Sequence, residues 1–233
     1  MPATDPGAQA PSPLLDILGQ ARQAGFLGPG AVEPHLAHAQ GFVAVARREA
    51  AAGSAASSPR LLDLGSGGGL PGLVVALEWP EATVVLLDAN RRRTEFLARA
   101  VSRLGLADRV SVVHDRAESA GRDPGLRGAM DGVVVRSFGP PAVVAECAAP
   151  FLRPGGWLIV SEPPGAAGGA EETPSAGGAP GGSRWPREPL SQFGLAPGEF
   201  VQGEFGYQIL WQRELCPERF PRRNGVPAKS PLF

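Results

Sequence analysis

Short runs of leucine and valine alternate with helical patterns between residues 60 and 162. Runs that are apolar along their whole length are typical of strands buried on both faces, as in parallel sheets. The segments between them repeat apolar residues every three or four positions, which predicts crossover helices. The chain is therefore predicted to be an α/β protein with a doubly wound sheet. Its predicted strands are 61–62, 83–87, 110–113, 132–135 and 157–161, and its predicted helices are 71–79, 91–104 and 141–152.

Different patterns flank this central region. Helical spacing predicts two helices, over 13–26 and 34–50, followed by a linker of small residues up to residue 58. We therefore expect a small N-terminal helical appendage over 1–58 and a main domain over 59–233. An antiparallel hairpin is predicted to close the sheet at its C-terminal side. The strands of this hairpin are 199–204 and 207–212.

Glycine and proline are abundant, at 32 and 25 of 233 residues, which indicates that parts of the chain lack packed structure. Residues 163–183 are mostly glycine, alanine and proline, and such a segment cannot bury enough apolar surface to offset the entropy of ordering. A flexible insert is predicted there. Residues 213–233 are rich in arginine and proline, and they are predicted to form an extended basic tail.

The overall charge narrows the choice of partners. The chain has 22 Lys and Arg against 23 Asp and Glu, so its net charge of −1 offers no general basic surplus to nucleic acid or membrane. Any RNA contact needs a local basic cluster. The two cysteines cannot form a disulfide framework. Residues 1–13 lack the features of a signal peptide, which favours a cytoplasmic protein with no membrane partner.

A glycine-rich loop gives the strongest chemical signal. It reads Asp63-Leu-Gly65-Ser-Gly67-Gly-Gly69 and joins the first predicted strand to the following helix. Glycines there let the backbone come close to a ligand, and the helix N-terminus offers free N–H groups. Asp88 ends the second predicted strand, where a carboxylate can accept hydrogen bonds from both ribose hydroxyls. The pattern predicts a ligand of the nucleotide type.

Two ligands compete for this loop. Gly67-x-Gly69-x-x-Gly72 also satisfies the dinucleotide fingerprint, which favours NAD. A carboxylate at Asp63 would repel a pyrophosphate, whereas it could pair with the ammonium group of S-adenosylmethionine. The only tyrosine, Tyr207, is not followed by the lysine of a Tyr-x-x-x-Lys reductase pair. S-adenosylmethionine is therefore the preferred cofactor and no metal is predicted, although Asp63 could simply cap the turn.

Several motifs occur in the order typical of one family. They are Asp63-Leu-Gly-Ser-Gly-Gly-Gly-Leu-Pro-Gly72, Leu87-Asp88 with Arg92-Arg93-x-x-Phe96-Leu97, Arg116-Ala117-Glu118, Val135-Arg136-Ser137-Phe138 and Pro221-Arg222-Arg223-x-Gly225-x-Pro227-x-Lys229-x-Pro231-Leu232. Over roughly 60–162 and 205–233 the chain resembles the small-subunit ribosomal RNA guanine-N7 methyltransferases, the RsmG or glucose-inhibited division protein B family. The resemblance implies a class I methyltransferase with a Rossmann-like fold and S-adenosylmethionine as cofactor.

The resemblance also implies roles for individual residues. Gly65 and Leu70 would contact the cofactor in the first loop. Ala117 and Glu118 would flank its adenine, and Arg136 would lie beside the methyl donor and orient the base or the cofactor. The complete set of expected cofactor-binding residues is Asp63, Gly65, Gly67, Gly69, Leu70, Asp88, Ala117, Glu118 and Arg136.

The acceptor implied by the resemblance is N7 of a guanine in 16S ribosomal RNA. This nitrogen has an available lone pair at neutral pH, so the protein needs to align it with the sulfonium methyl group and needs no general base. No proton-transfer residue is therefore assigned. Three tail residues would grip RNA phosphates, namely Arg222, Arg223 and Lys229.

The chain departs from the family in two respects. The usual N-terminal pattern is missing, and only His35 matches it. Glu162 stands where the family tends to have a lysine, which reverses the charge beside the expected substrate crevice. Two alternatives therefore stay open: a paralogue that methylates a different RNA or a small metabolite, and a non-catalytic cofactor-binding module of ribosome assembly. Simpler interpretations also exist for three of these features. Glu118 and the basic tail could be exposed to solvent without binding a ligand, and Arg136 could form a structural ion pair.

Overall fold

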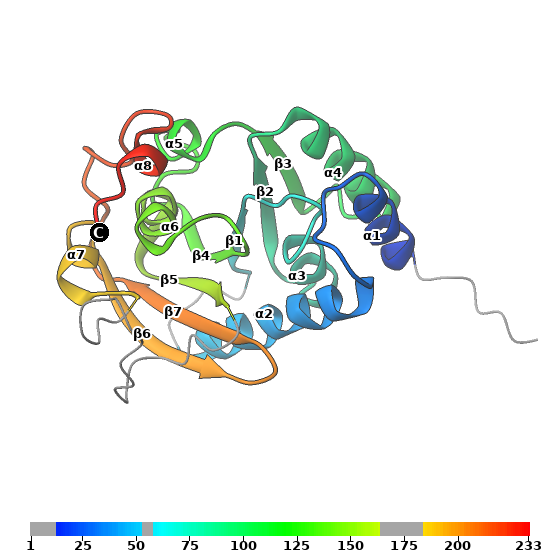
Figure 1. The fold of residues 1–233 in the computed structure, drawn as a ribbon, viewed down its shortest axis with the longest axis horizontal. Coiled ribbons are helices and arrows are strands. Elements are labelled where there is room, and N and C mark those ends of the chain that lie inside the picture. Colours follow the sequence, from blue (N-terminus) through cyan, green and yellow to red (C-terminus); the bar gives the residue numbers. More distant parts are fainter. Residues whose placement is uncertain (1–12, 53–57, 164–183) are drawn as a thin grey trace, which may run out of the picture.

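The computed structural model describes residues 13–52, 58–163 and 184–233. Within them, seven strands form one sheet in the order β3-β2-β1-β4-β5-β7-β6 (Figure 1). Neighbouring strands are parallel except that β7 runs antiparallel to both β5 and β6. The predicted doubly wound sheet with a C-terminal antiparallel hairpin is therefore confirmed. The strands are β1 (Arg60–Leu64), β2 (Thr83–Asp88), β3 (Val110–His114), β4 (Met130–Val135), β5 (Leu152–Glu162), β6 (Leu195–Gln202) and β7 (Gly206–Gln212).

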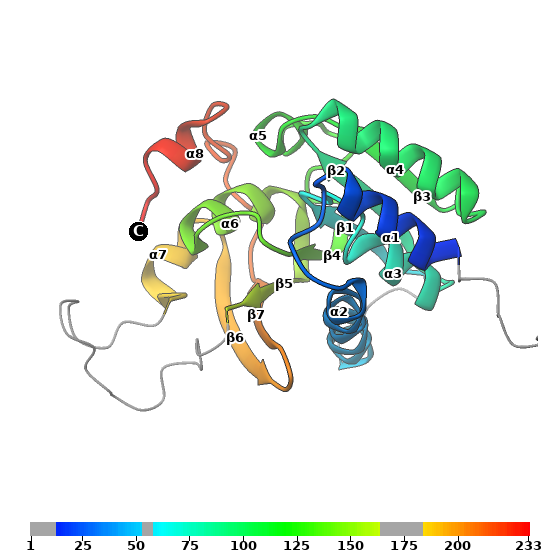
Figure 2. The ribbon, with the colours of Figure 1, turned by 45° about the vertical axis from the view of Figure 1, so that its right-hand side comes forward.

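Helices cover both faces of the sheet, as Figures 1 and 2 show. Successive side chains of a strand point to opposite faces, so Leu61 joins one buried core and Leu62 the other. One face carries α1 (Pro13–Gln23), α2 (Val32–Ala52), α3 (Gly72–Glu78) and α4 (Arg91–Arg103). The other face carries α5 (Ala117–Ala120), α6 (Pro141–Ala148), the short 3-10 turn η1 (Ala149–Phe151) and α7 (Arg187–Ser191), with α8 (Val226–Lys229) against α6.

The two N-terminal helices pack into the same core as the sheet. Leu18 of α1 and Phe42 of α2 are fully buried in the cluster that also contains Leu61 of β1 and Ile159 of β5. Polar contacts join the same elements, because Gln40 of α2 donates to the Glu78 carboxylate of α3 at 2.8 Å. The helices predicted as an appendage are thus attached directly over the sheet, while the domain boundary at residue 58 stays a prediction.

The main differences from the predicted elements lie in the C-terminal part. The strand predicted over 199–204 ends at Gln202 and begins four residues earlier, at Leu195, while the short helices α5, α7 and α8 were not predicted. The tail over 213–233 is not extended as expected, because it folds back onto α5 and α6 and contains α8 (Figure 2). Most of the predicted insert lies outside the described residues. In the described ranges, no helix is long and apolar enough to cross a membrane.

Candidate active site

The glycine loop lies at the carboxyl ends of the central strands. β1 and β4 are neighbours, and the chain leaves them toward opposite edges of the sheet, which is where ligands bind in open α/β folds. The loop is tied to β2, since the N–H groups of Gly65 and Ser66 donate to the Leu87 carbonyl at 2.8 and 3.0 Å. Gly65, Gly67 and Gly69 have φ angles of 75°, 54° and 98°, a region that favours glycine. The sequence therefore dictates the path of this loop.

Asp63 of β1 holds the end of the glycine loop through a hydrogen bond of its side chain. Its side chain is buried, and Oδ2 accepts a hydrogen bond from the Gly72 N–H at 2.9 Å. A side chain at position 72 would lie 2.5 Å from that oxygen, so the close approach requires glycine. Burial raises the pKa of Asp63 to about 7. This carboxyl group connects β1 to the start of α3, and its predicted contact with a ligand ammonium group stays a prediction.

Asp88 connects the end of β2 to the same loop. Its Oδ2 accepts from the Gly67 N–H at 2.9 Å, and its Oδ1 accepts from the Asn90 N–H at 2.8 Å. Nη1 of Arg93 lies 3.6 Å from Oδ2. The carboxylate therefore lies beside the glycine loop and helps to hold it, while its contact with the ribose hydroxyls stays a prediction.

A cavity of about 180 Å³ lies against the glycine loop. Four predicted cofactor residues line it: Gly65, Gly67, Leu70 and Arg136. Gly69 does not line it and instead allows a tight turn, because a side chain there would come within 2.4 Å of Leu73. The lining residues that sequence analysis missed are Phe26, Leu27, Gly28, Ser66, Gly68, Arg93 and Ser137.

Three of the missed residues belong to the α1–α2 loop, residues 24–31. Phe26 packs edge-on against Phe96 of α4, with ring centroids 5.6 Å apart. A side chain at Gly68 would lie 2.8 Å from Leu27, so the α1–α2 loop rests directly on the glycine loop. The sequence signal in this stretch, Gly28-Pro29-Gly30, indicates only that a helix ends. The position of the α1–α2 loop beside the cavity depends on tertiary packing.

Arg136 follows β4 and lines the cavity. Its Nη2 donates to Nδ1 of His35 at 2.5 Å, whereas its Nη1 is buried and has no hydrogen-bond partner among the described residues. Burial lowers the pKa of Arg136, and the nearby Asp63 opposes this effect. Ser137, the next residue, has a φ of 54° that is unusual for a residue other than glycine. Arg136 therefore lines the cavity with one donor unused, while its place beside the methyl donor stays a prediction.

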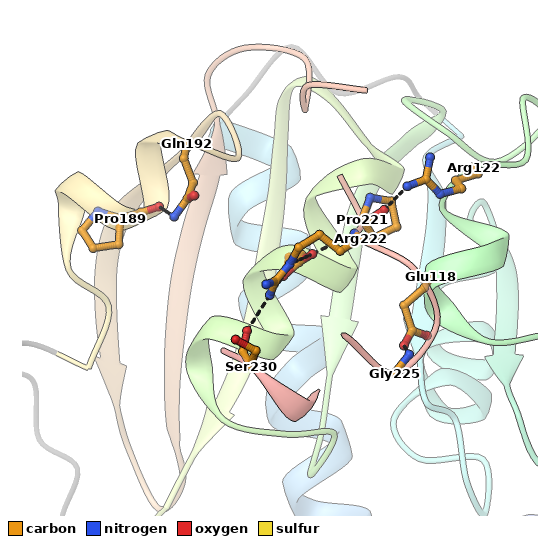
Figure 3. Close-up of polar contacts among 9 residues, drawn as sticks. Glu118, Arg122, Pro189, Gln192, Pro221, Arg222, Gly225 and Ser230 are labelled. Atoms are coloured by element: carbon orange, nitrogen blue, oxygen red, sulfur yellow. Dashed lines mark hydrogen bonds and ion pairs between the residues drawn. The ribbon is translucent and has the colours of Figure 1, made fainter. Parts of the chain in front are cut away.

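Ala117 and Glu118 start α5 and do not line the cavity. Oε1 of Glu118 accepts from Arg116 Nη2 at 2.9 Å. It also accepts from the Gly225 N–H of the tail at 2.7 Å (Figure 3). Burial alone would raise the pKa of Glu118, but these hydrogen bonds outweigh it and lower the pKa. The Glu118 side chain is thus bound by the tail, and its role beside the adenine stays a prediction.

Arg222 is bound within the protein. Its Nε and Nη2 donate to Oε1 and Oε2 of Glu146 at 2.8 and 2.6 Å, and its backbone N–H also donates to Oε1 at 2.8 Å. Glu146 is only 1% exposed, so the guanidinium compensates a buried charge. The expected phosphate contact of Arg222 is therefore corrected to a structural ion pair. Arg223 and Lys229 are exposed, and the described part of the chain offers them no ion pair.

Glu162 is also neutralised by neighbours. Its Oε2 forms an ion pair with Arg184 at 2.8 Å, and its Oε1 accepts from Trp185 Nε1 at 2.6 Å. The side chain is only 3% exposed. The negative charge expected to repel RNA is therefore buried and paired. Across the described ranges, no cluster of side chains is suited to hold a metal ion.

Comparisons with known proteins agree with this geometry. The GidB family model, described as rRNA small subunit methyltransferase G, matches residues 49–162. The ribosomal RNA small subunit methyltransferase G of Prochlorococcus marinus (strain MIT 9313) is 35% identical over 178 residues, covering 74% of this chain and 68% of that protein. The protein of the same name from Thermotoga sp. (strain RQ2) is 36% identical over 173 residues, covering 74% and 72%.

Among solved structures, a methyltransferase from Geobacter sulfurreducens matches with a TM-score of 0.55 and 17% identity, over 92% of this chain and 91% of that one. This likeness concerns the fold, and it agrees with the predicted class I architecture. The predicted family, enzyme class and cofactor are confirmed. The chain belongs to the GidB family, and it is a methyltransferase that uses S-adenosylmethionine.

Proposed function

We propose that the protein transfers the methyl group of S-adenosylmethionine to N7 of a guanine in 16S ribosomal RNA. The observation that carries this proposal is the cavity between the glycine loop and Arg136, in a chain whose relatives are named for small-subunit ribosomal RNA methylation. Guanine N7 has a lone pair at neutral pH. Transfer therefore requires alignment of two reactants, and it requires no proton acceptor.

The residues present fit the cofactor. A cavity of about 180 Å³ is smaller than typical sites for drug-sized ligands, so it suits the amino-acid end of the cofactor. Arg93 lines it and can pair with a carboxylate, while loop backbone groups lie alongside. Asp88, at the end of β2, would accept from the ribose hydroxyls. When bound, S-adenosylmethionine supplies an electrophilic methyl group on a sulfonium.

The chain's own contribution is to bind and orient. Arg136 has an unused buried donor beside the cavity, and a donor can fix a nucleobase without removing a proton. The α1–α2 loop packs against the glycine loop and lines the same cavity. These features support the alignment of the two reactants, which is what this reaction requires of the protein.

RNA binding is assigned to Arg223 and Lys229. Both are exposed at the tail, and neither has an ion-pair partner in the described ranges. Cations that are free of carboxylates can neutralise phosphates and release counterions. The small-metabolite alternative rested mainly on Glu162 and the net charge of −1. The Arg184 ion pair of Glu162 removes the first of these reasons.

Methyl transfer to unmodified small ribosomal subunits tests the proposal. Subunits that lack the modification are incubated with the protein and tritiated S-adenosylmethionine, and the labelled base is mapped. We expect label at one guanine of the 16S RNA, with the chemical cleavage behaviour of an N7-methylated base. Asp88→Ala serves as the cofactor-deficient control. Label in another molecule or on another base atom would refute the proposal.

A further inference from the structure

His35 of α2 holds the side chain of Arg136 beside the cavity, with 2.5 Å between Nδ1 of His35 and Nη2 of Arg136. A guanidinium has only donors, so Nδ1 must be the acceptor and the ring carries its proton on Nε2. A proton on Nδ1 would set two cations against each other. The contact therefore exists only while His35 is neutral.

The same imidazole also touches the α1–α2 loop. A side chain at Gly28 would lie 3.5 Å from Cε1 of His35, so the ring lies against the Gly28 backbone. Gly28 and Arg136 both line the cavity. His35 thus lies between the α1–α2 loop and Arg136, both of which line the cavity.

α2 is fixed firmly enough for His35 to act as a support. The hydroxyl of Tyr207 on β7 donates to the His38 carbonyl at 2.8 Å. The His38 ring is stacked on Phe205, with ring centroids 4.4 Å apart and an interplanar angle of 6°. A side chain at Gly41 would collide with the Tyr207 hydroxyl, so this close approach of helix and strand requires glycine. These contacts lie within two turns of His35.

We propose that His35 is a positioning residue for methyl transfer: in its neutral form it holds Arg136 so that the free Nη1 can donate to O6 of the acceptor guanine. O6 neighbours N7 on the same edge of the base, so a donor on O6 fixes the base and leaves the N7 lone pair free. Adenine presents an amino group at that position and would be rejected. This inference rests on the proposed function.

Other titratable groups face this contact and must be separated from His35. His38 lies one turn further along α2, and burial, with smaller effects of Arg136 and His35, lowers its pKa to about 4. Asp63 and Tyr207 face Arg136. Burial raises the pKa of Tyr207 beyond the working range and that of Asp63 to about 7. Asp63 therefore changes charge near neutral pH, so the variants and the parent are compared at one pH.

The test compares His35→Leu and His35→Asn with the parent, with His114→Asn as a matched control. His114 lies at the end of β3 and contacts the Ala89 carbonyl. Leucine removes the acceptor, so we expect kcat on small subunits to fall by at least about tenfold, with the S-adenosylmethionine Kd within about twofold. Asparagine offers an oxygen near the position of Nδ1 and does not titrate. We expect it to restore most of the rate.

His114→Asn should keep the kcat of the parent. Full activity of His35→Leu, an activity of His35→Asn no higher than that of His35→Leu, or a parallel loss of cofactor affinity would overturn the inference.

Nitrogen NMR of the full chain without RNA separates this inference from the proposed function. The Nε2–H tautomer of neutral His35, with Nδ1 as acceptor, supports the contact with Arg136. The Nδ1–H tautomer refutes it. The parent protein could methylate no ribosomal RNA while His35 is the Nε2–H tautomer. That result would refute the proposed function and leave the Arg136 contact established.

Discussion

The glycine-loop end of the sheet and the C-terminal tail both carry motifs of the same family, but they use their charged side chains differently. At the glycine-loop end, Arg136 lines a cavity and keeps a buried donor without a partner. In the tail, the Arg222 guanidinium donates hydrogen bonds to the Glu146 carboxylate. It also donates to the Ser230 carbonyl (Figure 3). The first arrangement can act on a ligand, whereas the second maintains the fold.

The comparison shows that a place in a motif does not decide the role of a charged residue. That role depends on whether other groups of the protein already pair with the charge. Glu118 and Arg222 are both satisfied by partners far away in the chain, at separations of 107 and 76 residues. The tail motif therefore serves first to fasten the tail to α5 and α6, and only its exposed cations are available to RNA.

Arg222→Ala tests the structural side of this comparison and should have the largest effect. It leaves Glu146 as an unpaired buried carboxylate, so we expect a loss of about 3 to 5 kcal/mol in the free energy of unfolding. Urea unfolding measures it. Arg223→Ala, one residue along and exposed, should change stability by less than about 0.5 kcal/mol. Equal effects of the two substitutions would remove the distinction between them.

Asp88→Ala tests the ligand side. The variant loses the expected hydrogen bonds to the ribose hydroxyls, and we expect S-adenosylmethionine binding to weaken by about 2 to 4 kcal/mol. Calorimetric titration measures the Kd. Asp108→Ala removes an exposed carboxylate away from the cavity and should leave the Kd unchanged. Unaltered binding by Asp88→Ala would show that the ribose assignment is wrong.

Asp63→Asn tests whether the loop carboxyl group is a buried support. Burial raises its pKa to about 7 from an ordinary 3.8, so the folded chain binds this proton more tightly than the unfolded chain. The resulting stabilisation is complete below about pH 4 and is lost as the pH rises through 7. Relative to the variant, the parent should therefore lose about 1 kcal/mol of unfolding free energy between pH 6 and pH 8. A difference that does not change with pH would mean that Asp63 does not titrate near pH 7 in the folded chain.

Arg223→Ala combined with Lys229→Ala tests the exposed cations of the tail, with the smallest expected effect. Each phosphate contact contributes about 0.7 to the salt dependence of single-strand binding, so the double variant should reduce the slope of log K against log salt by about 1.4. Cofactor affinity should not change. A slope equal to that of the parent would exclude the tail from the RNA contact.

Much of the sheet could be predicted because its information is local. Each strand from β1 to β5 contains adjacent apolar residues, and the turn residues of the glycine loop directly follow the end of β1 at Leu64. By contrast, the pairs His35–Arg136 and Arg222–Glu146 span 101 and 76 residues, so no local pattern reports them. The folding of the tail was missed for the same reason, since prolines and arginines read locally as an extended segment.

A crystal structure with S-adenosylhomocysteine tests the central distinction most directly. We expect the homocysteine end to lie in the cavity beside Gly65, Gly67 and Arg136, with the ribose at Asp88. We also expect that Glu118 keeps its hydrogen bond to the Gly225 N–H and that Arg222 stays on Glu146. A ligand bound away from the glycine loop, or a Glu118 carboxylate that leaves Gly225 to bind the ligand, would contradict the account.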